Sequence, residues 1–166
     1  MKDIVSSLFQ KYKQKGILID TNILLLWFVG TVNRERIPKF NRTEQFVPED
    51  YDSLVKILSY FNKIVTTPNI LTEVNSLANK LVGPERSQFL SVFAKGVARL
   101  NDSYLESTEV VRTDSFTKFG LTDGGIATLA KNKYLVLTDD LKLASYLQKI
   151  EIDTINFNNI RVYGWK

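Results

Sequence analysis

The chain of 166 residues contains no cysteine and no histidine, and these two absences exclude whole classes of chemistry. Without cysteine there is no disulfide, no thiolate nucleophile and no thiolate-bound zinc. Without histidine there is no imidazole base and no imidazole metal ligand. The oxygen ligands of Asp and Glu remain, and they suit hard cations such as Mg²⁺, Mn²⁺ and Ca²⁺. Any hydrolytic chemistry in this chain is therefore expected to use carboxylates that hold such cations.

A long apolar run is also missing. The longest, residues 23–29, is far shorter than the roughly 20 residues that a helix needs to cross a bilayer. Asp20 and Asn22 interrupt its N-terminal side, and residues 30–34 offer a poor cleavage site for a signal peptide. The sequence therefore predicts no transmembrane segment and a cytoplasmic location.

What the chain does have is a mildly basic, mixed composition. Its 22 Lys and Arg residues exceed its 18 Asp and Glu residues, which gives a formal charge of +4 and a pI of about 9.2. The excess favours a polyanionic partner, and ordinary solubilising charge explains it equally well. With 44% hydrophobic residues and no internal repeat or linker, residues 1–166 are expected to form a single domain with one core.

Short apolar runs alternate with segments whose apolar residues recur at helical spacing. Strands are predicted at residues 17–19, 64–66, 134–137 and 153–157, with a further β-prone stretch at 107–112. The N-terminal segment 1–15 is predicted to be helical from residue 3. Further helices are predicted at 21–29, 51–61, 67–81, 84–100, 122–131 and 141–148, with Thr67 and Thr122 as caps. Residues 31–50 sustain no period and predict a basic loop or flap. The alternation predicts a three-layer α/β/α fold with a central, mostly parallel sheet.

Acidic residues stand where apolar runs stop. Asp20 follows residues 17–19, and Asp139 and Asp140 follow residues 134–138. Because parallel sheets place their sites at the carboxyl ends of the strands, we expect these acids to share one edge of the sheet. Helix capping is the alternative explanation for each of them, and one of Asp139 and Asp140 is expected to cap the next helix.

Two further carboxylates lie on predicted helices. Asp123 heads the apolar stripe of its helix, so it is expected to face inward, where a charge needs a cation, hydrogen-bond donors or a raised pKa. A first-turn Asp favoured by the helix dipole is the alternative. Glu73 borders the apolar face of its helix and could equally be a solvated edge charge. Thr138 and Asn22 are placed to hydrogen-bond neighbouring carboxylates or a bound water.

Gathered at one edge, these acids would repel one another strongly, so divalent cations are the natural occupants. A hard cation can lower the pKa of a bound water, position a phosphodiester and stabilise the charge that builds during displacement. Such a site would supply what the missing histidine cannot.

With these residues in place, the chain resembles the PIN-domain family of metal-dependent nucleases, in particular its toxin-type members. Four segments carry the resemblance: GILIDTNILL at 16–25, LTEV at 71–74, GLTDGGIATLA at 120–130 and VLTDDL at 136–141. The resemblance implies a PIN-like, Rossmann-like fold. It also implies the following site residues: the metal-site acids Asp20, Glu73, Asp123 and Asp140, with Asp139 as the alternate, and the orienting residues Thr138 and Asn22.

The same resemblance implies one or two Mg²⁺ or Mn²⁺ ions and hydrolysis of RNA phosphodiester bonds by water, which leaves 5′-phosphate and 3′-hydroxyl ends. A toxin-type member also implies an antitoxin protein and a homodimer as partners. The basic residues of the loop are candidates for RNA contacts, with Phe40 and Phe46 stacking on bases, and a solvated basic loop is the equal alternative. These basic residues are Arg34, Arg36, Lys39 and Arg42.

Other functions fit the same residues less closely. A catalytically weak PIN-like scaffold that binds RNA or protein is the main alternative. A phosphotransfer receiver would need adjacent acids near its first strand, whereas the adjacent pair here is late in the chain. A haloacid-dehalogenase-type phosphatase would need a second Asp at the position of Asn22.

Overall fold

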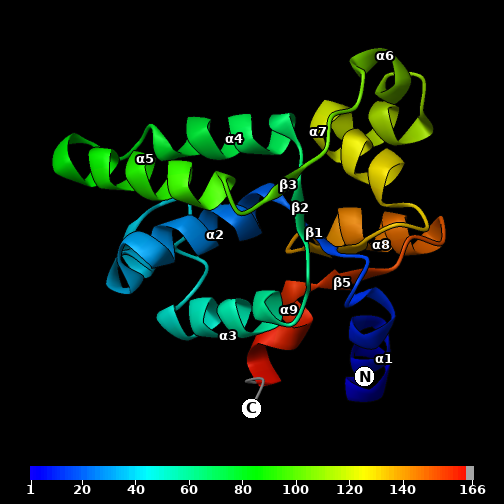
Figure 1. Cartoon of the computed structure of the whole chain (residues 1–166), viewed down its shortest axis with the longest axis horizontal. Helices are drawn as coiled ribbons and strands as arrows, with labels where there is room; N and C mark the ends of the chain where they lie inside the picture. Colours follow the sequence, from blue (N-terminus) through cyan, green and yellow to red (C-terminus); the bar gives the residue numbers. More distant parts are fainter. Residues whose placement is uncertain (164–166) are drawn as a thin grey trace.

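Alternating strands and helices run through the whole of the described chain, which in the computed structural model covers residues 1–163 (Figure 1). The strands are β1 (Ile17–Ile19), β2 (Ile64–Thr66), β3 (Asn101–Asp102), β4 (Leu135–Thr138) and β5 (Thr154–Asn156). The α-helices are α1 (Lys2–Tyr12), α2 (Thr21–Val32), α3 (Pro48–Ser59), α4 (Pro68–Ala78), α5 (Gly83–Val97), α6 (Ser107–Val110), α7 (Asp114–Ala130), α8 (Leu141–Lys149) and α9 (Phe157–Ile160). Two 3₁₀ helices are η1 (Arg34–Lys39) and η2 (Arg161–Tyr163).

The five strands form one sheet in the order β3-β2-β1-β4-β5, and every pair is parallel. The chain first builds outward from β1 to β2 and β3, then crosses to the other side of β1 for β4 and β5. The strand order therefore reverses between β1 and β4, and in open parallel sheets ligands bind outside the carboxyl ends of the strands at such a point. Asp20 follows β1 and Asp139 follows β4, so both lie at this reversal.

Helices cover the sheet in a three-layer α/β/α arrangement, as the sequence predicts. α2 packs against α3, α4 and α5, whereas α7 and α8 pack on each other and on β4 (Figure 1). The described residues contain no helix that is both long and apolar enough to cross a membrane.

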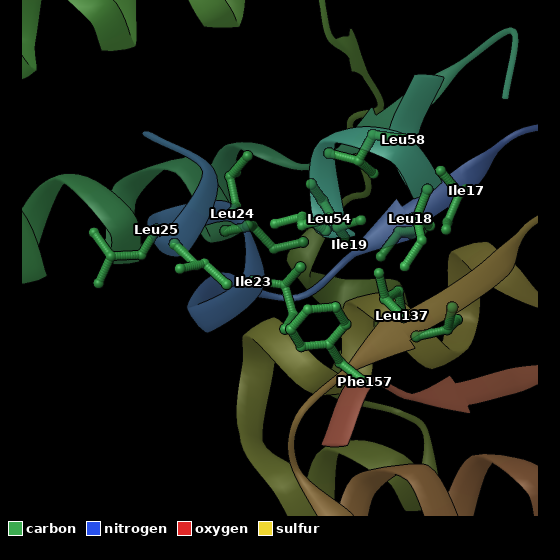
Figure 2. Close-up of a cluster of buried hydrophobic side chains, with 14 of the residues drawn as sticks. Ile17, Leu18, Ile19, Ile23, Leu24, Leu25, Leu54, Leu58, Leu137 and Phe157 are labelled. Carbon is green, nitrogen blue, oxygen red and sulfur yellow. The ribbon is translucent and has the colours of Figure 1, made fainter. Parts of the chain in front are cut away.

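The core follows from the composition of β1 and α2. All three residues of β1 are fully buried, as expected for a central parallel strand covered on both faces. α2 is apolar almost all round, which is the pattern of a helix enclosed by its neighbours. Figure 2 shows side chains of both elements packed together with residues from α3, β4 and α9: Ile17, Leu18, Ile19, Ile23, Leu24, Leu25, Leu54, Leu58, Leu137 and Phe157.

Four predicted strands and most predicted helices are confirmed, with ends shifted by a few residues. The predicted β-prone stretch at 107–112 is wrong, because it contains the short helix α6. β3 was not expected, since it has only two residues, Asn101 and Asp102, and both are exposed. Residues 31–50 are not a continuous loop, because they contain η1 and the start of α3 at Pro48.

The largest difference concerns α7. Thr113, and not Thr122, caps this helix by accepting a hydrogen bond from the backbone N–H of Phe116. The helix is interrupted at Gly120, whose φ of 85° is a left-handed conformation that glycine adopts without strain. Residues 121–130 therefore form a second helical segment with its own beginning, and Asp123 lies close to that beginning. The predicted cap at Thr67 is confirmed by its hydrogen bond from Ile70 N–H.

Candidate metal centre

Asp20 stands between the end of β1 and the start of α2, where it caps the helix. Its Oδ1 accepts a hydrogen bond from the Thr21 backbone N–H at 2.6 Å, and its Oδ2 accepts one from the Thr138 hydroxyl at 2.6 Å. The side chain is 7% exposed, and burial raises its pKa to about 6 although both donors lower it. The charges of Asp139 and Asp140 add to the rise. Asp20 is thus a buried carboxylate with other acids close by.

The residues after β4 face Asp20 from the neighbouring strand. The Thr138 hydroxyl, which donates to Asp20, also accepts a hydrogen bond from the Asp140 backbone N–H at 3.0 Å. Asp140 caps α8, because its Oδ1 accepts from the N–H groups of Lys142 and Leu143 at 2.8 and 3.0 Å. The expectation that one of the adjacent pair is a helix cap is therefore confirmed for Asp140.

Asp139 lies beside α2. Both of its carboxylate oxygens are 3.3 Å from the Asn22 side-chain amide, which donates to them. Burial raises the pKa of Asp139, and hydrogen bonds from Asn22 and Gln45 oppose that rise. Asn22 thus hydrogen-bonds a neighbouring carboxylate.

Glu73 extends from α4 toward two other helices. Its Oε2 accepts a hydrogen bond from the Thr21 hydroxyl on α2 at 2.8 Å, and its Oε1 accepts one from the Thr122 hydroxyl on α7 at 2.6 Å. The residue is exposed, unlike Asp20. Its carboxylate is therefore held between α2 and α7 at the surface of the molecule.

Asp123 differs from the other four acids in its partners. Within residues 1–163, no hydrogen bond or ion pair is made by its carboxylate. Burial raises its pKa to about 7, and the charges of Asp20, Glu73 and Asp140 raise it further. Asp123 is thus a partly buried carboxylate that experiences like charges and has no compensating partner among the described residues.

The five acids, which we call the acid edge, come from four elements or their ends and act on one another electrostatically. They do not form a closed cage. In the described part of the chain, no three of them lie close enough together to hold one metal ion. Their expected convergence on one ion is therefore not seen among the described residues. The acid edge consists of Asp20, Glu73, Asp123, Asp139 and Asp140.

The chemistry of the acid edge nevertheless fits a hard divalent cation. Mg²⁺ keeps several of its waters and is commonly bound by one or two carboxylates together with substrate phosphates, so a cage of three acids is not required. Asp123 has an oxygen ligand to offer and no partner among the described residues, and its repulsion from Asp20 would be relieved by a cation. Asp20 and Asp123 are accordingly the two residues best suited to hold such an ion.

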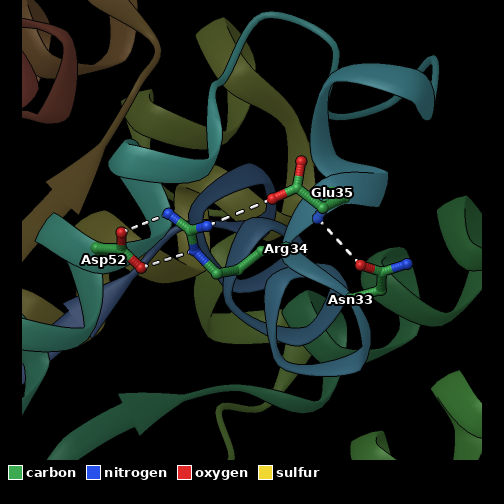
Figure 3. A network of polar contacts seen from close by, with 4 residues as sticks. All are labelled: Asn33, Arg34, Glu35 and Asp52. Atoms are coloured by element: carbon green, nitrogen blue, oxygen red, sulfur yellow. Dashed lines mark hydrogen bonds and ion pairs between the residues drawn. The ribbon is translucent and has the colours of Figure 1, made fainter.

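Two of the three arginines expected to contact RNA, Arg34 and Arg36, already have partners within the protein. Arg34 donates to the two carboxylate oxygens of Asp52 at 3.0 and 2.6 Å and lies 3.4 Å from Glu35, as Figure 3 shows. Arg36 donates to Glu85 at 2.8 Å and to the Lys39 carbonyl at 2.6 Å. These contacts fix the start of the basic segment onto α3 and α5.

The expected stacking of Phe40 and Phe46 on bases is wrong, because their rings are 3% and 0% exposed and belong to the core. The basic segment begins at Arg34, after the end of α2, whereas Asp20 caps the start of α2. Because α2 has 12 residues and is about 18 Å long, the segment begins far from the acid edge. It returns at Gln45, which hydrogen-bonds Asp139. Lys39 and Arg42 are exposed.

Several residues of the site were not singled out from the sequence. Neither Thr21 nor Thr122 was expected to contact Glu73, yet both donate their hydroxyls to it. Gln45 and Asn158 also contact Asp139, the latter by donating to its backbone carbonyl at 3.0 Å. No spacing rule signals these contacts, because each joins residues from distant parts of the chain.

A hollow of about 260 Å³ between α1 and α3 is lined by no acidic residue, so it does not mark the acid edge. A smaller hollow of about 50 Å³ separates the start of α4 from Gly125 of α7. Neither hollow is lined by a residue of the acid edge.

Comparison with profiles of known protein families, with curated proteins and with solved structures gave no significant match. The basis for a function is therefore the fold, the acid edge and the motifs of the sequence.

Proposed function

We propose that this protein is a metal-dependent endoribonuclease of the PIN-domain type, which hydrolyses RNA phosphodiester bonds with one or two Mg²⁺ or Mn²⁺ ions. The single observation that carries the proposal is the carboxylate of Asp123, which makes no hydrogen bond or ion pair within residues 1–163 and whose pKa is raised to about 7 by burial and by the charges of Asp20, Glu73 and Asp140. Like charges gathered at the reversal of strand order are a costly arrangement unless a cation binds there.

Asp20 and Asp123 would hold the ion, with Asp140 and Asp139 nearby. When bound, a hard cation lowers the pKa of a water and neutralises charge that builds on a phosphate. The chain's own residues orient the acids for that task. Thr138 donates to Asp20 and fixes the direction of its carboxylate, and it accepts the N–H of Asp140, so one hydroxyl connects the ends of β1 and β4. Asn22 holds Asp139 in the same way.

The substrate is proposed to be RNA on two grounds. The formal charge of the chain is +4 although five acids gather at one edge, so the remaining surface is distinctly basic. Lys39 and Arg42 are exposed on the segment that returns to Asp139 through Gln45. Phosphate contacts from such cations bind nucleic acid without reading its sequence. A toxin role with an antitoxin partner, a homodimer and a cytoplasmic location belong to the same proposal.

Purified protein incubated with a single-stranded RNA and Mn²⁺ tests this function. We expect cleavage that leaves 5′-phosphate and 3′-hydroxyl ends, is abolished by EDTA, and is lost in the variant Asp123→Asn. Cleavage that survives EDTA, or is equal in wild type and Asp123→Asn, would reject the proposal.

A second candidate is a PIN-like scaffold that binds RNA or protein with little or no catalysis. One observation favours it: within residues 1–163, no three acids are close enough to share an ion. The two functions separate in the same assay, because a scaffold binds labelled RNA equally well in EDTA and in Mn²⁺ and leaves it intact.

A further inference from the structure

Glu73 has an unusual set of partners for an expected metal ligand. Its two carboxylate oxygens each accept a side-chain hydroxyl, from Thr21 at 2.8 Å and from Thr122 at 2.6 Å. The two threonines belong to α2 and α7, whereas Glu73 belongs to α4, and α4 packs against both of those helices. One carboxylate therefore joins three helices. Figure 1 shows these helices, α2, α4 and α7, which follow different strands of the sheet.

The hydrogen bond from Thr122 to Glu73 lies just after the point where α7 is interrupted. Gly120 breaks the helix with a φ of 85°, so the segment that follows it is not held in line by the first half of α7. A Cβ at Gly120 would meet nothing within 4 Å, which means that the glycine is needed for its conformation and not for space. The far part of the segment is anchored in the core by Ile126. Its beginning is held by Thr122, the residue immediately before Asp123.

We infer that Glu73 is a positioning residue, a bracket between Thr21 and Thr122 that fixes where Asp123 lies, and that it is not itself a ligand of the metal ion. The metal part of this inference rests on the proposed function. Hydrogen bonds from hydroxyls to an ionised carboxylate are stronger than those between neutral groups, so two of them can fix the beginning of a helical segment. Asp123 makes no such bond within residues 1–163, so its oxygens remain available to an ion.

The variant Glu73→Gln separates the two roles. Its amide oxygen can accept the Thr122 hydroxyl, and its NH₂ can donate to the Thr21 hydroxyl oxygen, so the bracket is retained without the charge. A direct ligand would lose most of its affinity for Mn²⁺ on the same change. Glu73→Gln should therefore behave like wild type if Glu73 positions Asp123, and like Asp20→Asn if it binds the ion.

The first measurement is amide hydrogen exchange of the full chain in EDTA, read at residues 124–130. We expect Glu73→Ala and Thr122→Val to exchange about tenfold faster than wild type, and Glu73→Gln to stay within about threefold of it. Thr128→Val is the matched control, because the Thr128 hydroxyl donates within the same helical segment to the Gly124 carbonyl at 2.9 Å. Unchanged exchange in Glu73→Ala, or equal acceleration in Thr128→Val and Thr122→Val, overturns the bracket.

The second measurement is Mn²⁺ affinity by titration calorimetry. We expect Glu73→Gln to bind within about threefold of wild type, Glu73→Ala to bind about tenfold more weakly, and Asp20→Asn to bind about a hundredfold more weakly. An affinity of Glu73→Gln as low as that of Asp20→Asn overturns the inference and leaves the nuclease in place. A wild-type protein that binds no Mn²⁺ rejects the proposed function and, with it, the metal part of this inference, whereas the exchange data still decide on the bracket.

Discussion

The acid edge and the basic segment Arg34–Lys39 both concentrate charge of one sign, yet the protein compensates only one of them. Arg34 is held by Asp52 and Arg36 by Glu85, so the basic segment carries its own counterions. The acids at the ends of β1 and β4 receive only hydroxyl, amide and backbone N–H donors, and within residues 1–163 no Lys or Arg forms an ion pair with any of them. Paired charges of this kind serve the fold, whereas a collection of unpaired like charges is typical of functional sites.

The largest expected contrast between the two regions is in catalysis. Asp20→Asn removes a charge that would hold the ion and should lower Mn²⁺-dependent RNA cleavage about a hundredfold or more. Arg34→Ala removes only an internal ion pair and should change the rate less than about threefold. Initial rates on the same single-stranded RNA check both variants. Equal losses would mean that the basic segment binds substrate and that the contrast between the regions is wrong.

A second test uses the pH dependence of stability in EDTA. Burial and neighbouring charges raise the pKa of Asp20 to about 6 and of Asp123 to about 7 from an ordinary value of 3.8. At pH values between the ordinary pKa of 3.8 and these raised pKa values, the folded chain binds more protons than the unfolded chain. The free energy of unfolding should therefore fall as pH rises from about 4 to about 8. Urea denaturation across this range measures it. A stability that is flat, or that rises toward pH 8, would contradict the unpaired state of the acid edge.

Removing one of the repelling charges should stabilise the metal-free protein. Asp123→Asn relieves repulsion from Asp20, Glu73 and Asp140, and at pH 8 in EDTA it should raise the melting temperature by about 2–4 °C, the shift expected for roughly 1 kcal/mol in a chain of this size. The gain should be much smaller at pH 4, where Asp20 and Asp123 are protonated in the folded state and no longer repel each other. Asp52→Asn, which removes the carboxylate that pairs with Arg34 at 2.6 Å, should show no such gain. A fall in melting temperature at pH 8 would count against the repulsion.

The smallest expected effect lies in the basic segment. Arg36→Ala breaks a partly exposed pair with Glu85 and should lower the free energy of unfolding by about 0.2–1 kcal/mol. Because salt screens surface charges, the loss should shrink in 1 M NaCl. Urea denaturation at low and high salt measures the difference. A loss of several kcal/mol would show that this pair organises the fold far more than an ordinary surface ion pair does.

Some parts of the acid edge were predictable because they depend on local order along the chain. Asp20 and Asp139 each directly follow an apolar run, so the predicted ends of the strands also predicted the positions of these two acids. Asp123 was recognised by its place on an apolar helical face. The bracket of Glu73 could not be found this way, because Thr21 and Thr122 are separated from it by 52 and 49 residues.

Misjudged elements have equally physical causes. β3 is too short and too polar to give an apolar signal, and its pairing with β2 comes from the packing of the whole sheet. The β-branched residues around Val110 favoured a strand, but one helical turn buries Val110 against α7. Phe40 and Phe46 looked like surface aromatics of a basic loop, and the chain buries both because their apolar area gains more from the core than from solvent.

The sequence by itself determined the alternation of strands and helices, the parallel α/β/α architecture and the positions of acids at strand ends, because these follow from the periodicity of neighbouring residues. Only the tertiary structure decided which charges are paired. Arg34 reached Asp52, Glu73 reached two threonines, and Asp123 reached no partner within the described residues. Such pairings depend on distances between elements far apart in the chain, and those distances exist only once the sheet and its helices have packed.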